Sequence, residues 1–500
     1  MEFLGGVPHN YPMRTKFLIL LSVILSLSLV AAPSNAAVKA GAKCTKAGTT
    51  ATAAGKKFTC VKSGTRLVWN KGVAVKAAPK PSPNPVFKPV EPTPTPTPVV
   101  TPTPTPTPTP TVKSFVYQAP SEPSSDVELC KTKEASNSRG MTGAGFPEWN
   151  SLTPKTGKVK WALIPLDFAD VPGDANFRSR VDDQMKLLSD WFTTVSEGKL
   201  TVEWVVSDKW VRMPGRSSDY AIERSDNLDR STNGLKLWNT AMTQSDLSFD
   251  FTGIQTVNFI LPLSQTFLKE TVQGFPWDAG VKNFITNEGK VDSFSLPGNF
   301  MDQGGREYWS YWAHEFGHAI GLPHVGSSRE SNPFQAYDLM GTQDGPSREL
   351  SGWLRFYGGW FNKERVYCQE VSKLKSVDVT LVPLSDNLPG IKIVVVPVTQ
   401  TKTLIIESRR VTKFDCTTPT ARNGVLAYLY DSKLGHGDAF LTPFSPSERP
   451  LERDSCGSKN FSTPPTRDLL IHEGESVTVE GVRVEVLMHG NYDRIRITKP

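Results

Sequence analysis

Long hydrophobic runs are scarce in this 500-residue sequence. The most apolar run covers residues 17–30, which is shorter than the roughly 20 residues that a helix needs to cross a bilayer. It follows Met13-Arg-Thr-Lys16 and leads into small residues, the pattern of a secretory signal peptide over residues 1–36 with cleavage after Ala36. Because no later run could span a membrane, we expect an exported chain whose mature form has no transmembrane anchor.

Cysteine is also sparse, and the six cysteines include no C-x-x-C pair. In an exported chain without that spacing, cysteines are expected to form disulfides. Cys44 and Cys60 lie close together in a short segment, and we expect them to pair. The other four cysteines allow three pairings, of which we favour the combination Cys130–Cys368 with Cys416–Cys456.

Acidic residues are almost absent from residues 37–114, where twelve lysines and arginines face the single Glu91. We assign residues 37–75 to a small basic Cys-containing module and residues 76–114 to a Pro/Thr-rich linker in an extended polyproline II form. The module could hold an anionic cell-surface polymer, and the alternative is a solvated charged face without a dedicated partner. No nucleic-acid-binding motif is present, so nucleic acid is not expected as a partner.

Histidine is rare as well, yet three of the seven histidines fall within residues 311–324, Tyr-Trp-Ala-His-Glu-Phe-Gly-His-Ala-Ile-Gly-Leu-Pro-His. On a helix, His314 and His318 leave the same face one turn apart. Gly321 provides a left-handed exit, and the following proline cannot continue the helix. The chain should therefore turn and bring His324 back, which completes a three-histidine zinc site with an open fourth position.

Glu315 follows the first histidine and lies about 100° around the helix from it. Its carboxylate can act on a water molecule in the site without becoming a metal ligand, so we predict that Glu315 is the general base. The string Tyr337-Asp-Leu-Met-Gly341 then predicts a tight turn in which Met340 forms an apolar floor beneath the imidazoles. Asp338 is expected to hydrogen-bond a ligand histidine from behind, or else to serve only as a turn former.

These strings resemble the metzincin zinc metalloproteases, whose signature is His-Glu-x-x-His-x-x-Gly-x-x-His followed by a Met-turn. Over roughly residues 155–430 the chain resembles, more narrowly, the M6 group of bacterial metzincins, relatives of immune inhibitor A, with residues 191–202 as supporting similarity. Two departures stand out. Several M6 members have aspartate at the position of His324, and Thr342 replaces a tyrosine that some metzincins use as an extra ligand or oxyanion donor.

Hydrophobic periodicity predicts an α+β fold. Strand patterns alternate with helix patterns in the first half of the enzyme part, over 159–168, 181–194, 200–206, 233–243, 255–261 and 306–320. We assign residues 115–360 to a metzincin-like catalytic domain, a twisted sheet plus the active-site helix. Strand patterns dominate afterwards, over 377–382, 391–396, 404–407, 424–430, 476–479 and 482–487. Residues 361–500 are therefore expected to form a β-rich, sandwich-like domain.

The combined prediction is a secreted, zinc-dependent endopeptidase that acts on protein or peptide substrates. Two alternatives stay open: a wall-associated binding or adhesive protein with a non-catalytic zinc domain, and a zinc hydrolase acting on peptidoglycan peptides. Ca²⁺ is an additional candidate cofactor, but no D-x-[DN]-x-[DN]-G loop identifies ligands for it. His436 could line the cleft or bind a second ion, although a histidine between glycines is usually a plain loop residue. His472 and His489 have no partner spacing and are expected at the surface.

Overall fold

The computed structural model describes most of the chain between residues 39 and 499. The described ranges are 39–53, 56–74, 113–136, 143–148, 151–222, 232–269, 272–274, 284–298, 307–326, 332–415, 423–447, 449–452, 457–458, 461–462 and 466–499. The expected signal peptide, most of the linker, and Cys416 with Cys456 lie outside them. Within these ranges, no helix combines the length and apolar character needed to cross a membrane. The chain divides into two compact units, Met1–Pro106 and Thr107–Pro500.

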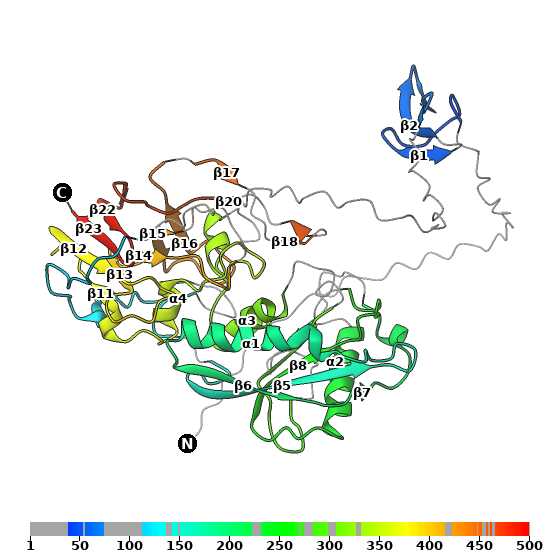
Figure 1. Ribbon diagram of the computed structural model, residues 1–500, viewed down its shortest axis with the longest axis horizontal. Helices are drawn as coiled ribbons and strands as arrows, with labels where there is room; N and C mark the ends of the chain where they lie inside the picture. Colours follow the sequence, from blue (N-terminus) through cyan, green and yellow to red (C-terminus); the bar gives the residue numbers. More distant parts are fainter. Residues whose placement is uncertain are drawn as a thin grey trace, which may run out of the picture. The chain divides into compact units, whose positions relative to one another are not determined.

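The first unit contains a small antiparallel sheet, drawn in blue in Figure 1. Its strands are β1 (Thr50–Ala53), β2 (Lys56–Ser63), β3 (Arg66–Trp69) and β4 (Val73–Ala74), and β2 pairs with each of the other three. The predicted disulfide between Cys44 and Cys60 is confirmed. Phe58 is buried beside it, and a side chain at Gly72 would meet the Phe58 ring at 2.8 Å. This small core therefore depends on the disulfide, one aromatic ring and one glycine.

The first half of the second unit is a six-stranded sheet in the order β6-β5-β8-β10-β9, with β7 also paired to β5. All pairings are parallel except that of β9 with β10. The strands are β5 (Gly157–Asp167), β6 (Leu200–Val206), β7 (Val211–Arg212), β8 (Ile254–Ile260), β9 (Val272–Gly274) and β10 (Ser293–Leu296). The helices are α1 (Arg178–Val195), α2 (Thr232–Asp246) and α3 (Tyr308–Ala319). Every helix and strand predicted in this half is present, with ends shifted by a few residues.

Helices cover both faces of this sheet, and β5 shows why. Alternate side chains of a strand point to opposite faces, so Trp161 packs with α1 and α3 while Ile164 packs with α2. The ring of Trp161 lies 4.6 Å from that of Phe316 on α3. Figure 1 shows α1 lying along the strands β5 and β6, and α3 packs against α1. The sheet and α1 thus form the platform on which α3 is held.

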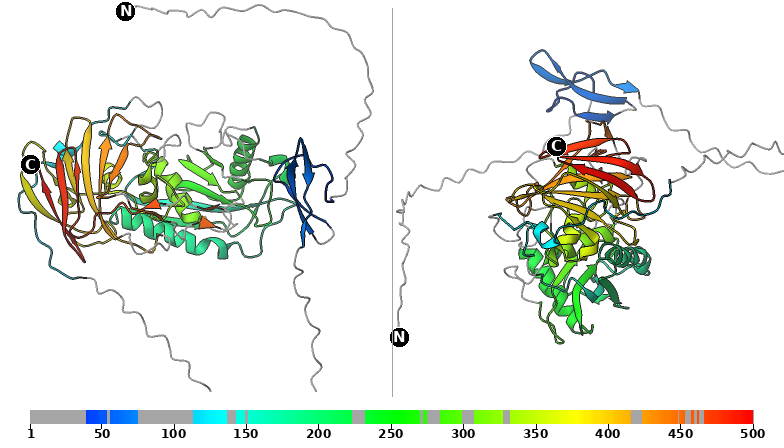
Figure 2. Two further views of the ribbon diagram at one scale, coloured as in Figure 1. Left: turned by 90° about the horizontal axis from the view of Figure 1, so that it is seen from above. Right: turned by 90° about the vertical axis from the view of Figure 1, so that its left-hand side faces the viewer.

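The second half of this unit consists of two stacked sheets, coloured yellow to red at one end of the unit in Figure 2. The first sheet has the order β11-β13-β14-β15-β16, with bounds Val366–Cys368, Ile393–Pro397, Lys402–Arg409, Gly424–Asp431 and Leu441–Phe444. The second has the order β12-β23-β22-β21, with bounds Ser376–Leu381, Asp493–Thr498, Val482–His489 and Ser476–Val479. Apolar side chains of both sheets share one core, which is the packing of a β-sandwich.

The five-stranded sheet is buried on both faces. Leu404 and Ile406 of β14 point into the sandwich core, whereas Ile405 between them joins the core that contains α3. Residues 113–130, assigned above largely to the catalytic half, run along the sandwich instead, where Ser121 and Ser125 bond to backbone carbonyls of β12 and β11. The predicted disulfide between Cys130 and Cys368 is confirmed and ties this segment to β11. The two halves therefore share a continuous core.

Short elements complete the unit. They are the 3-10 helices η1 (Val127–Cys130), η2 (Ser217–Tyr220), η5 (Pro333–Tyr337) and η6 (Lys363–Arg365), the helix α4 (Gly352–Tyr357), and the strand pairs β17 (Leu451–Glu452) with β20 (Thr466–Arg467) and β18 (Gly457–Ser458) with β19 (Phe461–Ser462). Of these, η5 leads directly into the Met-turn and α4 follows it.

Candidate metal centre

The helix α3 is buried on almost every side, and its sequence explains both of its ends. It begins after Glu307, which is in an extended conformation, and its cap residue is Ile320. Gly321 has the left-handed conformation expected for a helix exit, with φ of +90°. The Leu322 amide bonds back to the Gly317 carbonyl at 2.8 Å, so the chain turns sharply toward α3, as expected from the presence of Gly321. This turn directs the next residues to the face that carries His314 and His318.

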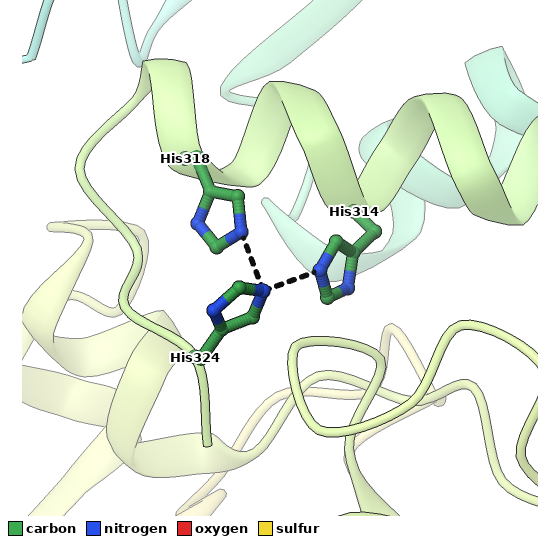
Figure 3. Close-up of side chains that lie close together, drawn as sticks. All are labelled: His314, His318 and His324. Carbon is green, nitrogen blue, oxygen red and sulfur yellow. Dashed lines mark hydrogen bonds between the residues drawn. The ribbon is translucent and has the colours of Figure 1, made fainter. Parts of the chain in front are cut away.

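The structure brings the three predicted ligand histidines together (Figure 3). The Nε2 atom of His324 lies 3.0 Å from that of His314 and 2.9 Å from that of His318. Ligand nitrogens on a tetrahedral zinc ion, at about 2.0–2.1 Å from the metal, are roughly 3.3 Å apart. The three imidazoles are therefore arranged on a scale that suits one small cation.

The other ring nitrogens decide which tautomer two of these histidines adopt. His314 Nδ1 lies 2.8 Å from the Leu339 carbonyl, and His318 Nδ1 lies 2.9 Å from the Leu322 carbonyl. A carbonyl only accepts, so both Nδ1 atoms donate, and both Nε2 lone pairs face the centre. The Nε2 of His324 can donate a proton to only one of them. A cation satisfies all three nitrogens at once, so the donor set fits a metal ion.

Burial favours the neutral imidazoles that metal binding requires. It lowers the pKa of His314 to about 4. Burial, with the nearby His314 as a smaller cause, lowers the pKa of His324 to about 2. The pKa of His318 is likewise held well below its ordinary range, mainly by burial. The site is therefore ready to bind a cation near neutral pH without first releasing protons.

The Met-turn lies directly against α3. Met340 is fully buried, and a Cβ added at Gly317 would lie 2.5 Å from its Sδ atom. Gly317 lies between His314 and His318, so the thioether packs against the stretch of helix that carries these two histidines. The Val325 amide also donates to the Met340 carbonyl at 3.0 Å. Met340 thus packs against the helix between His314 and His318, and its role as an apolar floor beneath the imidazoles stays a prediction.

Asp338 holds this turn from within. One carboxylate oxygen accepts the Met340 amide at 2.7 Å, and the other accepts the Ser351 amide at 2.8 Å. Burial raises the pKa of Asp338 to about 6. Asp338 is linked to His314 through the carbonyl of the neighbouring Leu339. Its own hydrogen bonds match the alternative prediction, in which Asp338 is a turn former.

Glu315 lies on the side of α3 that faces the sheet strands β8 and β10. It borders a cavity of about 10 Å³, which is close to the room that one water molecule needs. The other lining residues are mostly polar or aromatic: Thr256, Asn258, Ser293, Phe294, Ser295, Trp312 and Phe316. Two of the polar pairs bond across the strands, Thr256 with Ser293 at 3.0 Å and Ser295 with Asn258 at 2.8 Å. The carboxylate of Glu315 therefore has a small polar space beside it in an otherwise apolar core.

Little in the sequence indicates that His436 lies beside the three histidines, but the structure places it there. It lies in the loop between β15 and β16, and its Nδ1 accepts the backbone amide of His324 at 3.1 Å. Its ring centroid lies 4.7 Å from that of His324 and 5.7 Å from that of His318. Burial lowers the pKa of His436. The only sequence signal was its position between two glycines, which does not specify a partner.

His472 and His489, the other histidines that the structure describes, correct the expectation that they lack partners. His472 is partly buried and its Nε2 lies 2.8 Å from Asp468, while His489 Nδ1 lies 2.6 Å from Asp493. The hydrogen bond to Asp468 raises the pKa of His472. The second pair joins β22 to β23, and neither pair belongs to the group of three converging histidines.

No family model and no curated protein matches this chain. Solved structures with some likeness include wild-type OgpA from Akkermansia muciniphila, with 11% identity and a TM-score of 0.25 over 72% of this chain and 96% of that one. A second crystal form of the same protein has 12% identity and a TM-score of 0.25 over 71% of this chain and 97% of that one. The catalytically inactive form of that protein, in complex with the O-glycopeptide substrate glycodrosocin, has 11% identity and a TM-score of 0.23 over 72% of this chain and 96% of that one. Likeness this low shows neither the family nor the activity of this chain.

Proposed function

We propose that this chain is an exported zinc-dependent endopeptidase of the metzincin type. The observation that carries the proposal is the approach of His324 Nε2 to the Nε2 atoms of His314 and His318, at 3.0 and 2.9 Å. Glu315 lies on the helix that carries His314 and His318. The two disulfides of the described residues suit an oxidising, extracytoplasmic location.

The three histidines would hold the ion, and zinc held there supplies Lewis acidity toward water and a peptide carbonyl. The protein supplies the remaining parts. Leu339 and Leu322 fix the ring orientation of His314 and His318 through their carbonyls. Glu315 accepts a proton from the attacking water and returns it to the amine of the departing peptide. Such a proton transfer is typically worth roughly 10²–10⁴-fold in rate.

The deciding experiment replaces Glu315 with glutamine in the full chain. Glutamine keeps the size of the side chain and leaves all three imidazoles in place, so zinc content and folding should match the parent. Turnover of a susceptible peptide, selected from a mixed library with and without a chelator, should fall by roughly two decades or more with little change in KM. A glutamine variant as fast as the parent would refute the assigned role of Glu315.

The same library separates the alternatives. A non-catalytic binding protein would carry zinc but cleave nothing, with or without added metal. A hydrolase of wall peptides would cleave soluble peptidoglycan fragments and leave ordinary peptides intact. Chelator-sensitive cleavage of ordinary peptides, restored by added zinc, is the outcome that the proposal requires.

The first unit supports a second, separate function in surface binding. Its described residues include no acidic side chain, and its eight basic side chains are all exposed: Lys39, Lys43, Lys46, Lys56, Lys57, Lys62, Arg66 and Lys71. No ion pair among the described residues of this unit neutralises them, so these residues present a concentrated positive field. We propose that it retains the enzyme on an anionic cell-surface polymer.

Retention on polyphosphate-coated beads tests this second function. Retention should weaken steeply as salt rises, because exposed charges are screened over about 8 Å at physiological ionic strength. Changing Lys56, Lys57, Lys62 and Arg66 to glutamine should abolish most of it, whereas changing Lys158, Lys186, Lys373 and Lys433 of the second unit should not. Salt-independent retention, or equal retention by both variants, would contradict the proposal.

A further inference from the structure

The third ligand, His324, is the only one of the three that does not lie on α3. It lies in the connection after Gly321, and a ligand on a connecting segment needs support from outside that segment to keep its ring in place. Two neighbouring segments provide that support. On one side, the Val325 amide bonds to the Met340 carbonyl at 3.0 Å, which is a contact with the Met-turn.

On the other side lies the loop Leu434-Gly-His-Gly-Asp438, between β15 and β16 of the C-terminal sandwich. His436 Nδ1 accepts the His324 amide at 3.1 Å, and the Asp438 carbonyl accepts the Gly326 amide at 3.3 Å. The loop therefore contacts the segment of His324 at two alternate residues, once through the His436 side chain and once through the Asp438 backbone. Its imidazole also lies against the ring of His324, at 4.7 Å and an angle of 33°.

The loop itself is rigidly built. The Gly435 amide bonds to the Asp438 carboxylate at 3.0 Å, and the Asp438 amide bonds back to the Gly435 carbonyl at 2.9 Å. Gly437 has a φ of +78°, a conformation that other residues rarely adopt. Leu434 anchors the loop by packing against the core that contains α3. The glycines flanking His436 thus serve a defined turn that presents its ring.

We propose that His436 is a positioning residue for the metal centre: its Nδ1 atom locks the backbone of His324, so that the C-terminal sandwich sets the third ligand. The three converging nitrogens belong to His314, His318 and His324, and none belongs to His436. The inference rests on the proposed zinc site, and it adds that the site needs a contact between two parts of the sequence that are 112 residues apart.

The test measures zinc affinity of the full chain by competition with a zinc-binding dye. His436→Ala removes the acceptor and should weaken affinity by roughly 10–100-fold, the usual effect of losing a group that orients a ligand. His436→Asn places an amide oxygen near the position of Nδ1 and should recover most of that affinity. Lys433→Ala changes an exposed residue of the same connection and should match the parent.

Thermal unfolding in the presence of a chelator shows whether each variant still folds, and the Asn variant keeps the test decisive if the Ala variant does not. An Ala variant within twofold of the parent in zinc affinity, or an Asn variant no better than Ala, would overturn the positioning role. A parent chain that bound no zinc would instead refute the proposed function, and the inference with it.

Discussion

Replacing Gly317 with alanine tests how the Met-turn supports the histidines. A Cβ at this position would lie 2.5 Å from Met340 Sδ and 2.9 Å from Met340 Cε. Comfortable non-bonded contacts between heavy atoms of this kind are about 3.5–4.0 Å, so the new methyl group overlaps the thioether by about 1 Å. Met340 is fully buried, and its side chain can move only by displacing other core residues.

Two effects on stability oppose each other. Overpacking of this kind costs about 1–3 kcal/mol. Alanine in place of glycine inside a helix contributes about 1 kcal/mol in the other direction. The net loss should therefore be only about 0–2 kcal/mol. Zinc affinity should suffer more clearly, by about tenfold, because Leu339 beside Met340 supplies the carbonyl that orients His314.

Urea unfolding in the presence of a chelator measures the first effect, and dye competition for zinc measures the second. Met340→Ala is the matched control background, because it removes the atoms that the new methyl group would meet. In that background the penalty of Gly317→Ala should vanish, which corresponds to a coupling energy of about 1 kcal/mol or more. Parent-like zinc affinity in Gly317→Ala, or a penalty that persists with Met340→Ala, would refute the proposed support.

Metal analysis should show that His318→Ala loses most of the zinc while His472→Ala, whose ring pairs with Asp468, loses none. Burial raises the pKa of Asp338 to about 6. The protonated carboxyl therefore favours the folded state fully below about pH 4, and this contribution to the free energy of unfolding is lost as pH rises through 6. From pH 4 to 7 the stability of Asp338→Asn relative to the parent should therefore rise, by on the order of 3 kcal/mol, in urea unfolding with chelator; a constant difference would contradict the shift. Deleting residues 37–114, the basic module and its linker, should leave peptide turnover within about twofold of the parent, because an extended linker transmits little to the site. A large loss of turnover would show that the deleted residues are required.

Local spacing accounts for the part of the site that could be predicted from the sequence. His314, Glu315 and His318 take their relative positions from one helix, and the exit at Gly321 is a property of a single residue. Strands such as β5 were likewise predictable, because an uninterrupted apolar run of that length can only be buried. In each case the deciding interactions join residues close together in the chain.

Polar strands and partner choice could not be predicted in this way. The strand β10 reads Ser-Phe-Ser-Leu, and its serines are buried only because Asn258 and Thr256 of β8 accept or donate beside them. The hydrogen-bond partners of Asp338 could not be predicted for the same reason. Ser351 becomes its neighbour only because the chain returns after the Met-turn.

The sequence by itself thus determined which three histidines are candidates for a metal site and the helix that carries two of them. The tertiary structure decided how the third is held, because His436 reaches His324 only after β14 and β15 have paired and their sheet has packed against the core around α3. Helix periodicity acts over one turn of the chain, whereas the position of a loop between two strands depends on every layer packed beneath it.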